Sequence, residues 1–435
     1  MKAFTLAPVR FDFGHVKDRS DKLRGLVEGG PYQQLDNPPT FGFVFPNEYR
    51  DYANQLYLSM KNGVDPFKGV ENTFRFKLSK DQVFSISGFS LRSRNPHENA
   101  KQYEHVILDW IGGNNPKPDM FFVIHPQTPV TDADTPYYAC KARLLSAGII
   151  SQSVTSDLLR DKDRLRWSVA NIALGAFVKL GGTPWIVHGS EPDQELIIGL
   201  GRSYLYDRQS RQLTGYMGFT SCFSARGRFQ FVALADVADS REAYLPMLQN
   251  IVKESLKRVE GMDSAISSLT LHVPKEMNKE EMRAINAAIS TYKREKIPQL
   301  TVVKVSEEET FFAVDSDFRD GVPRRGTAIQ INDRDYLLYT EGREEREPWV
   351  TSRLPVALRV TPQASLQNPI AAKSLLRQVN DLSQVNWRGF NARSKPISAY
   401  YATLIARLLS HTPSTQLKAL DPVTKQLLES RMWFI

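Results

Sequence analysis

The sequence has few cysteines, scattered histidines and no long hydrophobic run, and each shortage argues against a class of protein. Cys140 and Cys222 are the two cysteines among 435 residues, and without a CxxC pair a structural zinc site or a disulfide framework is not expected. The seven histidines show no HExxH spacing, which argues against a metal cluster held by side chains alone. Apolar runs stay short of the roughly 18 to 20 residues of a membrane helix, and the first residues lack the apolar stretch of a signal peptide. We therefore expect a cytoplasmic protein.

Positive charge, by contrast, is in excess. The chain has 56 Lys and Arg against 48 Asp and Glu, a net charge of +8 and a pI of about 9.2. Such an excess is typical of proteins that bind a polyanion such as nucleic acid, although a generally basic soluble protein would show it too. The composition is otherwise that of a globular protein, with 41% hydrophobic and 24% charged residues. A chain of this length is expected to form two domains.

Strand and helix patterns alternate in the middle of the chain. The predicted elements are a buried strand at 120–125, a helix at 136–146 with proline in its first turn, a strand at 149–154, and a helix at 165–180 that stops at Gly181-Gly182. Strand, helix, parallel strand and helix in this order form a Rossmann-like unit.

The sequence Gly181-Gly182-Thr183-Pro184 predicts a domain boundary. The elements predicted after it are strands at 185–187 and 196–200, a hairpin at 214–235, a helix at 241–259, a strand at 269–272, a helix at 279–295, a strand at 300–305, a hairpin at 326–340, and helices at 371–382 and 397–409. This order is compatible with an RNase H-like domain but does not prove one.

Polar residues near the boundary occur at a spacing that suits a shared ligand. Tyr137 and Lys141 are four residues apart, so they share one face of the predicted helix. Gln152 follows in the next strand, and Lys179 stands just before the two glycines. An ordinary solvated surface could show the same Tyr–Lys pair. Because Tyr138 and Arg143 lie beside these residues, a register shifted by one position stays open.

Basic and aromatic residues mix again near the C-terminal end. Asn386-Trp387-Arg388-Gly389-Phe390 is followed by Arg393, by Lys395-Pro396 and by Tyr400-Tyr401-Ala402. An aromatic residue among basic ones suits a track for backbone phosphates better than a core, although a capped loop with solvated charges would look similar. The sequence ends Trp433-Phe434-Ile435, and this apolar character indicates burial.

Together these motifs resemble those of short prokaryotic Argonautes, from about Gly30 to Ile435. The lysine before Gly-Gly-x-Pro-Trp matches the family's junction between the MID and PIWI domains, and the Asn-Trp, basic stretch and Tyr-Tyr-Ala match its PIWI signature. The resemblance implies an α/β fold, with a Rossmann-like MID domain in residues 1–180 and an RNase H-like PIWI domain in residues 181–435. Residues 1–35 would form a lead that can pack against PIWI. The PAZ and N domains of longer members are not expected in 435 residues.

The family's binding residues carry over onto matching positions. The residues implied to bind the guide's 5′ end are Tyr137, Lys141, Gln152, Asn171 and Lys179. Of these, Asn171 would contact the first nucleotides, Tyr137 would stack on the first base, and the others would hold the 5′ phosphate. Arg388, Arg393 and Lys395 would contact the phosphates of the guide backbone.

The resemblance also implies a metal ion in this pocket. The C-terminal carboxylate of Ile435 would enter the 5′-phosphate pocket and help to hold a structural Mg²⁺, unless the apolar end serves only as a hydrophobic clamp. An archaeal Piwi-type relative has a glutamine four residues before the second lysine, where this chain has Gly175. That departure puts the metal's ligand set in doubt.

Active Argonautes cut their target with clustered carboxylates that hold two metal ions about 4 Å apart. The first of these residues ends the first PIWI strand, which here is Gly201. The second follows the strand at 269–272, at Val273 or Pro274, and the last follows Tyr-Tyr-Ala, at Thr403. Three positions therefore lack a metal ligand, and we expect a protein without slicer activity.

The resemblance implies a protein that anchors a 5′-phosphorylated guide, RNA or DNA, and pairs it with a complementary target, with DNA the preferred expectation. Short Argonautes act against plasmids and phages with an APAZ-containing partner that carries a SIR2, TIR or nuclease effector, so a heterodimer is expected. An active guide-directed nuclease and a nucleotide-cofactor-binding α/β protein stay open as alternatives. The missing carboxylates argue against the first, and the lack of a GxGxxG turn after 120–125 argues against the second.

Overall fold

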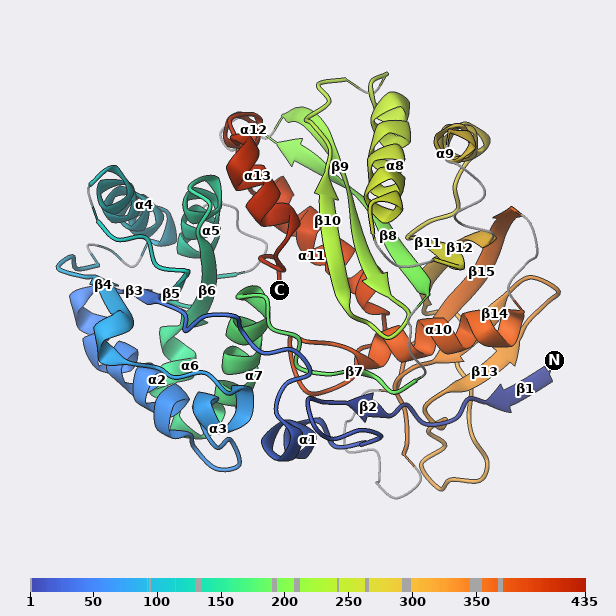
Figure 1. Cartoon of the computed structure of the whole chain (residues 1–435), viewed down its shortest axis with the longest axis horizontal. Coiled ribbons are helices and arrows are strands. Elements are labelled where there is room, and N and C mark those ends of the chain that lie inside the picture. Colours follow the sequence, from blue (N-terminus) through green and yellow to red (C-terminus); the bar gives the residue numbers. More distant parts are fainter. Residues whose placement is uncertain are drawn as a thin grey trace.

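The computed structural model describes residues 2–435 apart from 92, 94, 114, 130–134, 190–193, 207–211, 241, 263–265, 292–298, 345–353 and 367–370. Figure 1 shows two α/β lobes side by side, a smaller one in blue to green and a larger one in green to red. In the described ranges, no helix has both the length and the hydropathy of a membrane span. The mixed α/β fold expected from the sequence is confirmed.

The smaller lobe is built on a parallel four-stranded sheet in the order β4-β3-β5-β6. Its strands are β3 (Phe41–Val44), β4 (Val83–Ile86), β5 (Met120–His125) and β6 (Ile150–Thr155). Along β5 the side chains alternate between two buried faces. Phe121 and Val123 pack against one set of helices, while Phe122 and Ile124 pack into the core on the other side. The sheet is therefore covered on both faces.

Among the described residues up to 180, seven segments form α-helices. They are α1 (Lys22–Gly29), α2 (Arg50–Asn62), α3 (Val70–Phe74), α4 (Pro96–Gly112), α5 (Pro136–Ser146), α6 (Ser156–Arg160) and α7 (Lys162–Lys179). Helices α4 and α5 cover the Phe121 face, and α2 and α7 cover the other. The predicted sequence of strand, helix, parallel strand and helix is confirmed by β5, α5, β6 and α7.

The larger lobe is built on a nine-stranded mixed sheet in the order β1-β13-β14-β15-β12-β11-β8-β9-β10. Its strands are β1 (Lys2–Thr5), β8 (Glu195–Tyr206), β9 (Leu213–Ser224), β10 (Phe229–Leu234), β11 (Ser268–Val273), β12 (Gln299–Glu308), β13 (Thr327–Gln330), β14 (Tyr336–Tyr339) and β15 (Ala357–Leu366). Strands β8, β11 and β12 run parallel at its centre.

Helices pack on both faces of the large sheet. They are α8 (Tyr244–Glu260), α9 (Lys279–Ser290), α10 (Ala372–Gln384), α11 (Ile397–Ser410), α12 (Ser414–Lys418) and α13 (Pro422–Glu429). Ile198 of β8 packs in one cluster with α8 and α9, and its neighbour Ile197 packs in another with α11. Because neighbouring strand residues face opposite sides, α11 lies across the sheet from α8 and α9.

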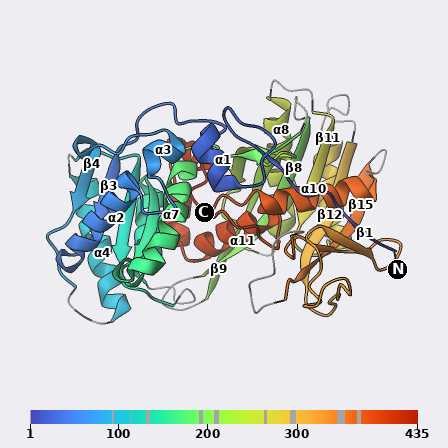
Figure 2. The ribbon, with the colours of Figure 1, turned by 90° about the horizontal axis from the view of Figure 1, so that it is seen from below.

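The N-terminal segment crosses from the large lobe to the junction between the lobes (Figures 1 and 2). Strand β1 pairs with β13 at the edge of the large sheet. Strand β2 (Phe11–Asp12) then pairs with β7 (Ile186–Val187), which follows the Gly181-Gly182 turn. Figure 2, seen from below, shows α1 in front of the junction. The N-terminal segment thus helps to hold the lobes together.

Two long helices, α2 and α4, lie before residue 120, where the sequence patterns described above predicted no element. Helix α4 starts with Asn95 as its N-cap and Pro96 in its first turn, and it buries Tyr103 and Ile107. Those signals were present in the sequence, but most of the other positions in α4 are polar. Helix α2 is similar, with a few buried residues on one face. Both helices are amphipathic coverings of the small sheet, so hydrophobic content alone did not reveal them.

Candidate nucleic-acid interface

Two lysines from different helices meet at one carbonyl oxygen. The Lys141 Nζ donates to the Ser151 carbonyl at 2.5 Å, and the Lys179 Nζ donates to the same oxygen at 3.0 Å. Lys141 lies on α5, Lys179 is the last residue of α7, and Ser151 is in β6 between them. The side chains are 8% and 1% exposed respectively. The fold therefore brings two buried amines to one point at the edge of the small lobe.

Gln152 completes this arrangement. Lys179 also donates to the Gln152 Oε1 at 2.5 Å. A Cβ atom added at Gly175 would lie 3.4 Å from that oxygen, so α7 passes close to the amide. Lys141, Ser151, Gln152 and Lys179 together form the lysine pocket. Three of the residues expected at the guide's 5′ end are thus in contact, directly or through one carbonyl.

The lysine pocket holds more positive charge than its own residues neutralise. In the described part of the chain, the contacts of the two amines are a carbonyl, an amide oxygen and each other, with no carboxylate among them. Burial lowers the pKa of Lys141 to about 8, and the Arg388 charge adds to this effect. Burial and the charges of Lys141 and Arg388 hold the pKa of Lys179 well below 10.5. Buried charges without a counter-charge are unfavourable, so this pocket is suited to an anion.

Tyr137 lies one helical turn from Lys141 and keeps part of its ring accessible. Its ring centroid is 6.2 Å from that of His125 and 4.8 Å from that of Tyr138. Burial raises the pKa of Tyr137, while the charges of Arg388 and Arg407 lower it. A neutral, partly exposed tyrosine one helical turn from Lys141 can stack on a base.

The shifted register left open by the sequence is disfavoured. Tyr138 is 2% exposed and stacks on His411 at the end of α11, with ring centroids 3.8 Å apart. Arg143 points to α4, where its Nε lies 3.2 Å from Glu104. Tyr138 and Arg143 thus both contact other residues of the protein, His411 and Glu104. Tyr137 and Lys141 are therefore the pair that faces the pocket.

Sequence analysis did not identify Arg407 or His411 as residues of this region. The charge of Arg407 acts on both Tyr137 and Tyr138. Helical spacing offered a signal, because Arg407 is seven residues after Tyr400 and so on the same face of α11. Arg407 and His411 approach α5 because of how the two lobes pack, and no local sequence pattern predicts that packing.

The loop at 386–390 brings a third cation to the lysine pocket. The Arg388 side chain is exposed, and its Nη1 donates to the Tyr400 hydroxyl at 3.1 Å. Its charge acts on Lys141, Lys179 and Tyr137. The large lobe thus contributes to a site whose buried amines come from the small lobe.

Asn171 fastens this loop to α7. Its Oδ1 accepts from the Phe390 amide at 3.3 Å, and a Cβ added at Gly389 would lie 3.2 Å from the same oxygen. The backbone of the loop therefore approaches the helix closely, which a residue larger than glycine would hinder. Asn171 lies at the edge of the candidate interface and holds the loop that carries Arg388.

The two other basic residues expected on the guide track differ from each other. Arg393 is exposed and lies over the Tyr400 ring, 5.3 Å from its centroid. Lys395 pairs with Glu307 at 3.0 Å. Arg388 and Arg393 therefore flank one tyrosine with their charges open, whereas the charge of Lys395 is already compensated.

The C-terminal residues are buried between the lobes. Phe434 is 3% exposed and packs 5.6 Å from the Tyr401 ring, and Ile435 is 8% exposed. The donor set nearby is poor for Mg²⁺, which prefers several oxygen ligands. Lysines already occupy the Ser151 carbonyl and the Gln152 amide oxygen, and Gly175 offers no side chain. The pocket residues by themselves do not fit Mg²⁺, and its binding through Ile435 stays a prediction.

The resemblance implies slicer carboxylates at Gly201, at Val273 or Pro274, and at Thr403, and these residues are called the slicer position below. The expectation that Gly201 ends its strand is wrong, because β8 continues to Tyr206 and pairs Gly201 with Phe219. A Cβ at Gly201 would lie 2.3 Å from the Phe219 ring. Val273 is 1% exposed, while Thr403 is exposed and its hydroxyl donates to the Ala399 carbonyl. Among the described residues, no three His, Cys, Asp or Glu side chains are grouped to hold a metal.

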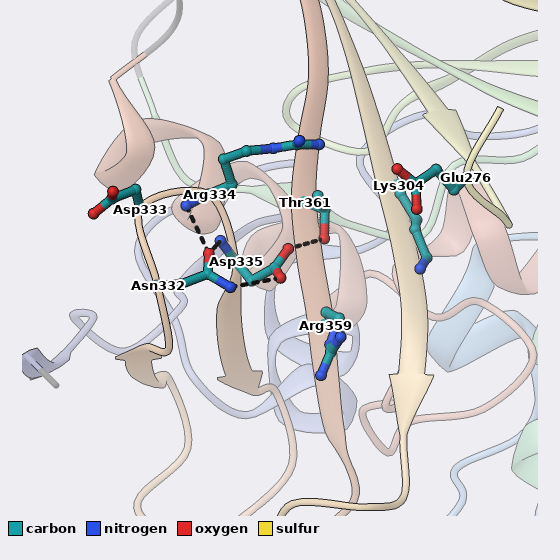
Figure 3. A pocket seen from close by; sticks show the side chains of 8 residues that line it. All are labelled: Glu276, Lys304, Asn332, Asp333, Arg334, Asp335, Arg359 and Thr361. Atoms are coloured by element: carbon teal, nitrogen blue, oxygen red, sulfur yellow. Dashed lines mark hydrogen bonds between the residues drawn. The ribbon is translucent and has the colours of Figure 1, made fainter. Parts of the chain in front are cut away.

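A separate hollow of about 400 Å³ lies on the large lobe (Figure 3). Its lining residues are Glu276, Lys304, Asn332, Asp333, Arg334, Asp335, Arg359 and Thr361. Cations and acids alternate in it. Asp335 accepts from Thr361 at 2.6 Å, and Arg359 pairs with Glu308 at 2.9 Å. Its charges are largely balanced, in contrast to those of the lysine pocket.

Comparisons with known proteins agree with this architecture. The Piwi domain family matches residues 129–412. A "Piwi protein" of Archaeoglobus fulgidus is 22% identical over 437 residues, which cover 97% of this chain and 95% of that protein. A "Protein argonaute" of Cereibacter sphaeroides is 21% identical over 434 residues, covering 93% of this chain and 55% of that one.

A solved structure gives the same result for the fold. Clostridium butyricum Argonaute, bound to a guide DNA and a 19-mer target DNA, superposes with a TM-score of 0.71 at 17% identity. The match covers 95% of this chain and 53% of that one. This chain therefore spans about half the length of both Argonautes and nearly the whole of the archaeal protein.

Proposed function

The chain belongs to the Piwi domain family, and from that premise we propose that it anchors the 5′ phosphate of a guide strand in the lysine pocket and pairs the guide with a complementary target. The observation that carries the proposal is the meeting of Lys141 and Lys179 at the Ser151 carbonyl, both buried and without a carboxylate partner in the described residues. An anion that enters this pocket replaces solvation that the amines have already lost.

A terminal phosphate suits the site better than a single carboxylate. It carries up to two charges and three acceptor oxygens, so it can accept from both amines and from the Gln152 amide at once. Arg388 adds a third positive charge at the open side. Tyr137 offers a ring to the first base, which makes a nucleotide a better ligand than inorganic phosphate.

Arg388 and Arg393 would then meet the next phosphates of the strand. Both are exposed and both contact Tyr400, by a hydrogen bond and by cation–π contact. Phosphate contacts of this kind fix the position of a strand without reading its sequence. Target choice is therefore assigned to base pairing with the guide, RNA or DNA, and DNA is the target we favour.

We propose further that the chain does not cleave its target. This rests on the slicer position, where glycine, valine or proline, and threonine stand in place of carboxylates. The Phe219 ring occupies the space into which a side chain at residue 201 would extend. Two-metal cleavage needs carboxylate ligands that these residues do not supply.

Without cleavage, target pairing has to act through a second protein or by occupancy. We propose the former, with an APAZ-containing effector of SIR2, TIR or nuclease type in a cytoplasmic defence against plasmids or phages. Exposed apolar side chains on the large lobe support a protein partner, since Phe312 is 75%, Val314 69% and Leu354 57% exposed. A stable 1:1 complex with such a protein would be the expected native form.

The test uses the nucleic acid that the protein carries from its own host. The protein is purified with its partner, and the bound strands are sequenced by methods that do and do not require a 5′ phosphate. We expect short strands of narrow length that bear this phosphate, and no cut product when a complementary target is added with Mg²⁺ or Mn²⁺. Strands of random length with mixed 5′ ends would contradict the anchoring proposal.

A further inference from the structure

The segment at residues 11–33 braces the junction between the lobes. Besides the β2–β7 pairing, Gln33 and Thr183 exchange two backbone hydrogen bonds at 2.9 and 3.0 Å. The Phe13 ring packs 6.5 Å from the ring of Trp185. These contacts fix α1 against the turn that joins the two lobes.

Lys22, the first residue of α1, reaches from this brace into the large lobe. Its Nζ donates to the Phe390 carbonyl at 2.9 Å, and its side chain is buried. The same nitrogen lies 4.9 Å from the centroid of the Phe11 ring and 5.6 Å from that of Trp185. Hydrogen bond and aromatic contacts together leave this amine little freedom.

Phe390 is thereby held on both sides of its backbone. Its amide donates to Asn171 of α7, and its carbonyl accepts from Lys22 of α1. The other end of the loop is fixed as well, since the Trp387 amide donates to the Tyr401 hydroxyl at 2.9 Å. Arg388 lies between these two fixed points. Its position relative to the lysine pocket depends on both.

We propose that Lys22 is a positioning residue, which sets Arg388 against the guide phosphates and so lets the N-terminal segment control guide affinity without touching the guide. The inference rests on the proposed function, because it assumes that Arg388 binds the guide. It explains why a buried amine stands at residue 22, where packing alone would favour an apolar side chain.

An apolar side chain would pack against Phe11 and Trp185 without the cost of burying an amine. Burial, and then the Arg325 charge, lower the pKa of Lys22 to about 7, which shows that the environment disfavours the charged form. The hydrogen bond to Phe390 is the contact that only a donor can make. The buried amine of Lys22 is thus explained by its hydrogen bond to the loop that carries Arg388.

The test compares Lys22→Met with Arg24→Met, which removes the same charge from an exposed position of α1. Affinity for a 5′-phosphorylated oligonucleotide is measured on the full chain at fixed salt, with the melting temperature of each variant. We expect Lys22→Met to weaken binding about tenfold, which is the loss expected when Arg388 no longer makes one charged hydrogen bond to a guide phosphate. Arg24→Met should leave binding unchanged, because its side chain pairs with Glu28 within the helix.

A double variant separates positioning from general stability. If Lys22 acts through Arg388, then Lys22→Met should cost less than about twofold once Arg388→Ala is present, since coupled residues are non-additive. A full tenfold loss in that background would overturn the proposal, as would an unchanged affinity of Lys22→Met itself. Should Lys22→Met fail to fold, Lys22→Gln replaces it, because its shorter amide cannot span the same distance.

Hydrogen exchange on the wild type tests the same coupling between α1 and the Arg388 loop without a substitution. Guide binding should slow amide hydrogen exchange in residues 386–392 and in α1 together. Slower exchange in the loop alone would contradict the coupling. If the wild type does not bind 5′-phosphorylated strands at all, the proposed function itself is wrong. If the wild type binds them and Lys22→Met binds equally well, only the role of Lys22 is wrong.

Discussion

The lysine pocket and the slicer position differ in whether their buried residues are favourable for folding. In the lysine pocket, two amines stay buried although nothing in the described chain neutralises them. At Gly201, the space for a side chain is filled by the Phe219 ring, and ordinary packing results. An unfavourable arrangement that persists points to a ligand, because stability alone would favour apolar residues there. The Phe219 ring beside Gly201 leaves little room for a longer side chain, and the proposed lack of cleavage rests in part on this packing.

The largest expected effect comes from removing an amine from the lysine pocket. Lys179→Met should weaken binding of a 5′-phosphorylated guide about 100-fold, the order expected when a buried charge partner is removed. The same change should stabilise the guide-free protein by roughly 1 kcal/mol or more, because a buried amine without a carboxylate is replaced by an apolar side chain. Filter binding and thermal unfolding measure the two effects.

Lys257→Met is the matched control for that change. Lys257 is an exposed residue of α8 that pairs with Glu254, so its loss removes the same charge far from the pocket. Affinity and stability should both stay near the wild-type values. A drop in stability for Lys179→Met would contradict the view that this amine is kept at a cost.

The second effect concerns the slicer position. Gly201→Asp combined with Thr403→Asp should yield no cleavage, and the first change should destabilise the fold by about 2 to 3 kcal/mol, since it crowds Phe219 and buries a charge. Gly201→Ala measures the crowding alone. Cleavage of a target at a fixed distance from the guide's 5′ end, by the double variant with Mn²⁺, would show that the position is poised for metals after all.

The third effect is a pH dependence with opposite signs for binding and folding. Lys141 has a pKa of about 8 in the folded protein against an ordinary value of 10.5. Guide affinity should therefore fall as pH rises above about 8, since the amine must be charged to bind phosphate. Stability of the guide-free protein should rise over the same range, because the unfolded chain binds more protons there. Lys141→Met should reduce the slope of both profiles between pH 8 and 10.5. Lys179 and Lys22, whose pKa values burial also lowers, should account for the stability slope that remains.

The smallest expected effect is that of divalent metal. Removing Mg²⁺ with EDTA should change guide affinity by less than about threefold, since the pocket's oxygen atoms already accept from lysines. A loss as large as that of Lys179→Met would mean that the carboxylate of Ile435 and a metal carry the binding.

The sequence predicted local structure well where hydrophobic periodicity was strong. Strand β5 and helices α5 and α7 lie where their patterns indicated, because β5 is a short run of apolar residues buried on both faces, α5 has proline in its first turn and α7 stops at Gly181-Gly182. Helices α2 and α4 were missed, although each has apolar residues at helical spacing and α4 begins with the helix-start signal Asn95-Pro96. The end of β8 was misjudged at Gly201, where pairing with β9 carries the strand on to Tyr206. Partner strands override local glycine signals.

The candidate site was predictable only in part. Lys141, Gln152 and Lys179 were identified from a spacing that resembles a known family, and the fold brings them together. Lys22 carried no such signal, because its partner Phe390 is 368 residues away. Contacts of this kind depend on how the lobes pack, and no single helix or strand pattern encodes them.

The most direct test of the account measures what the 5′ phosphate itself contributes. Guides of one sequence, with a 5′ phosphate or a 5′ hydroxyl, are bound to the wild type and to Lys179→Met at one salt concentration. The account predicts that the phosphate strengthens binding to the wild type by about tenfold or more and contributes far less to the variant. Equal affinities of the two guides for the wild type would contradict the claim that the lysine pocket holds a guide's 5′ phosphate.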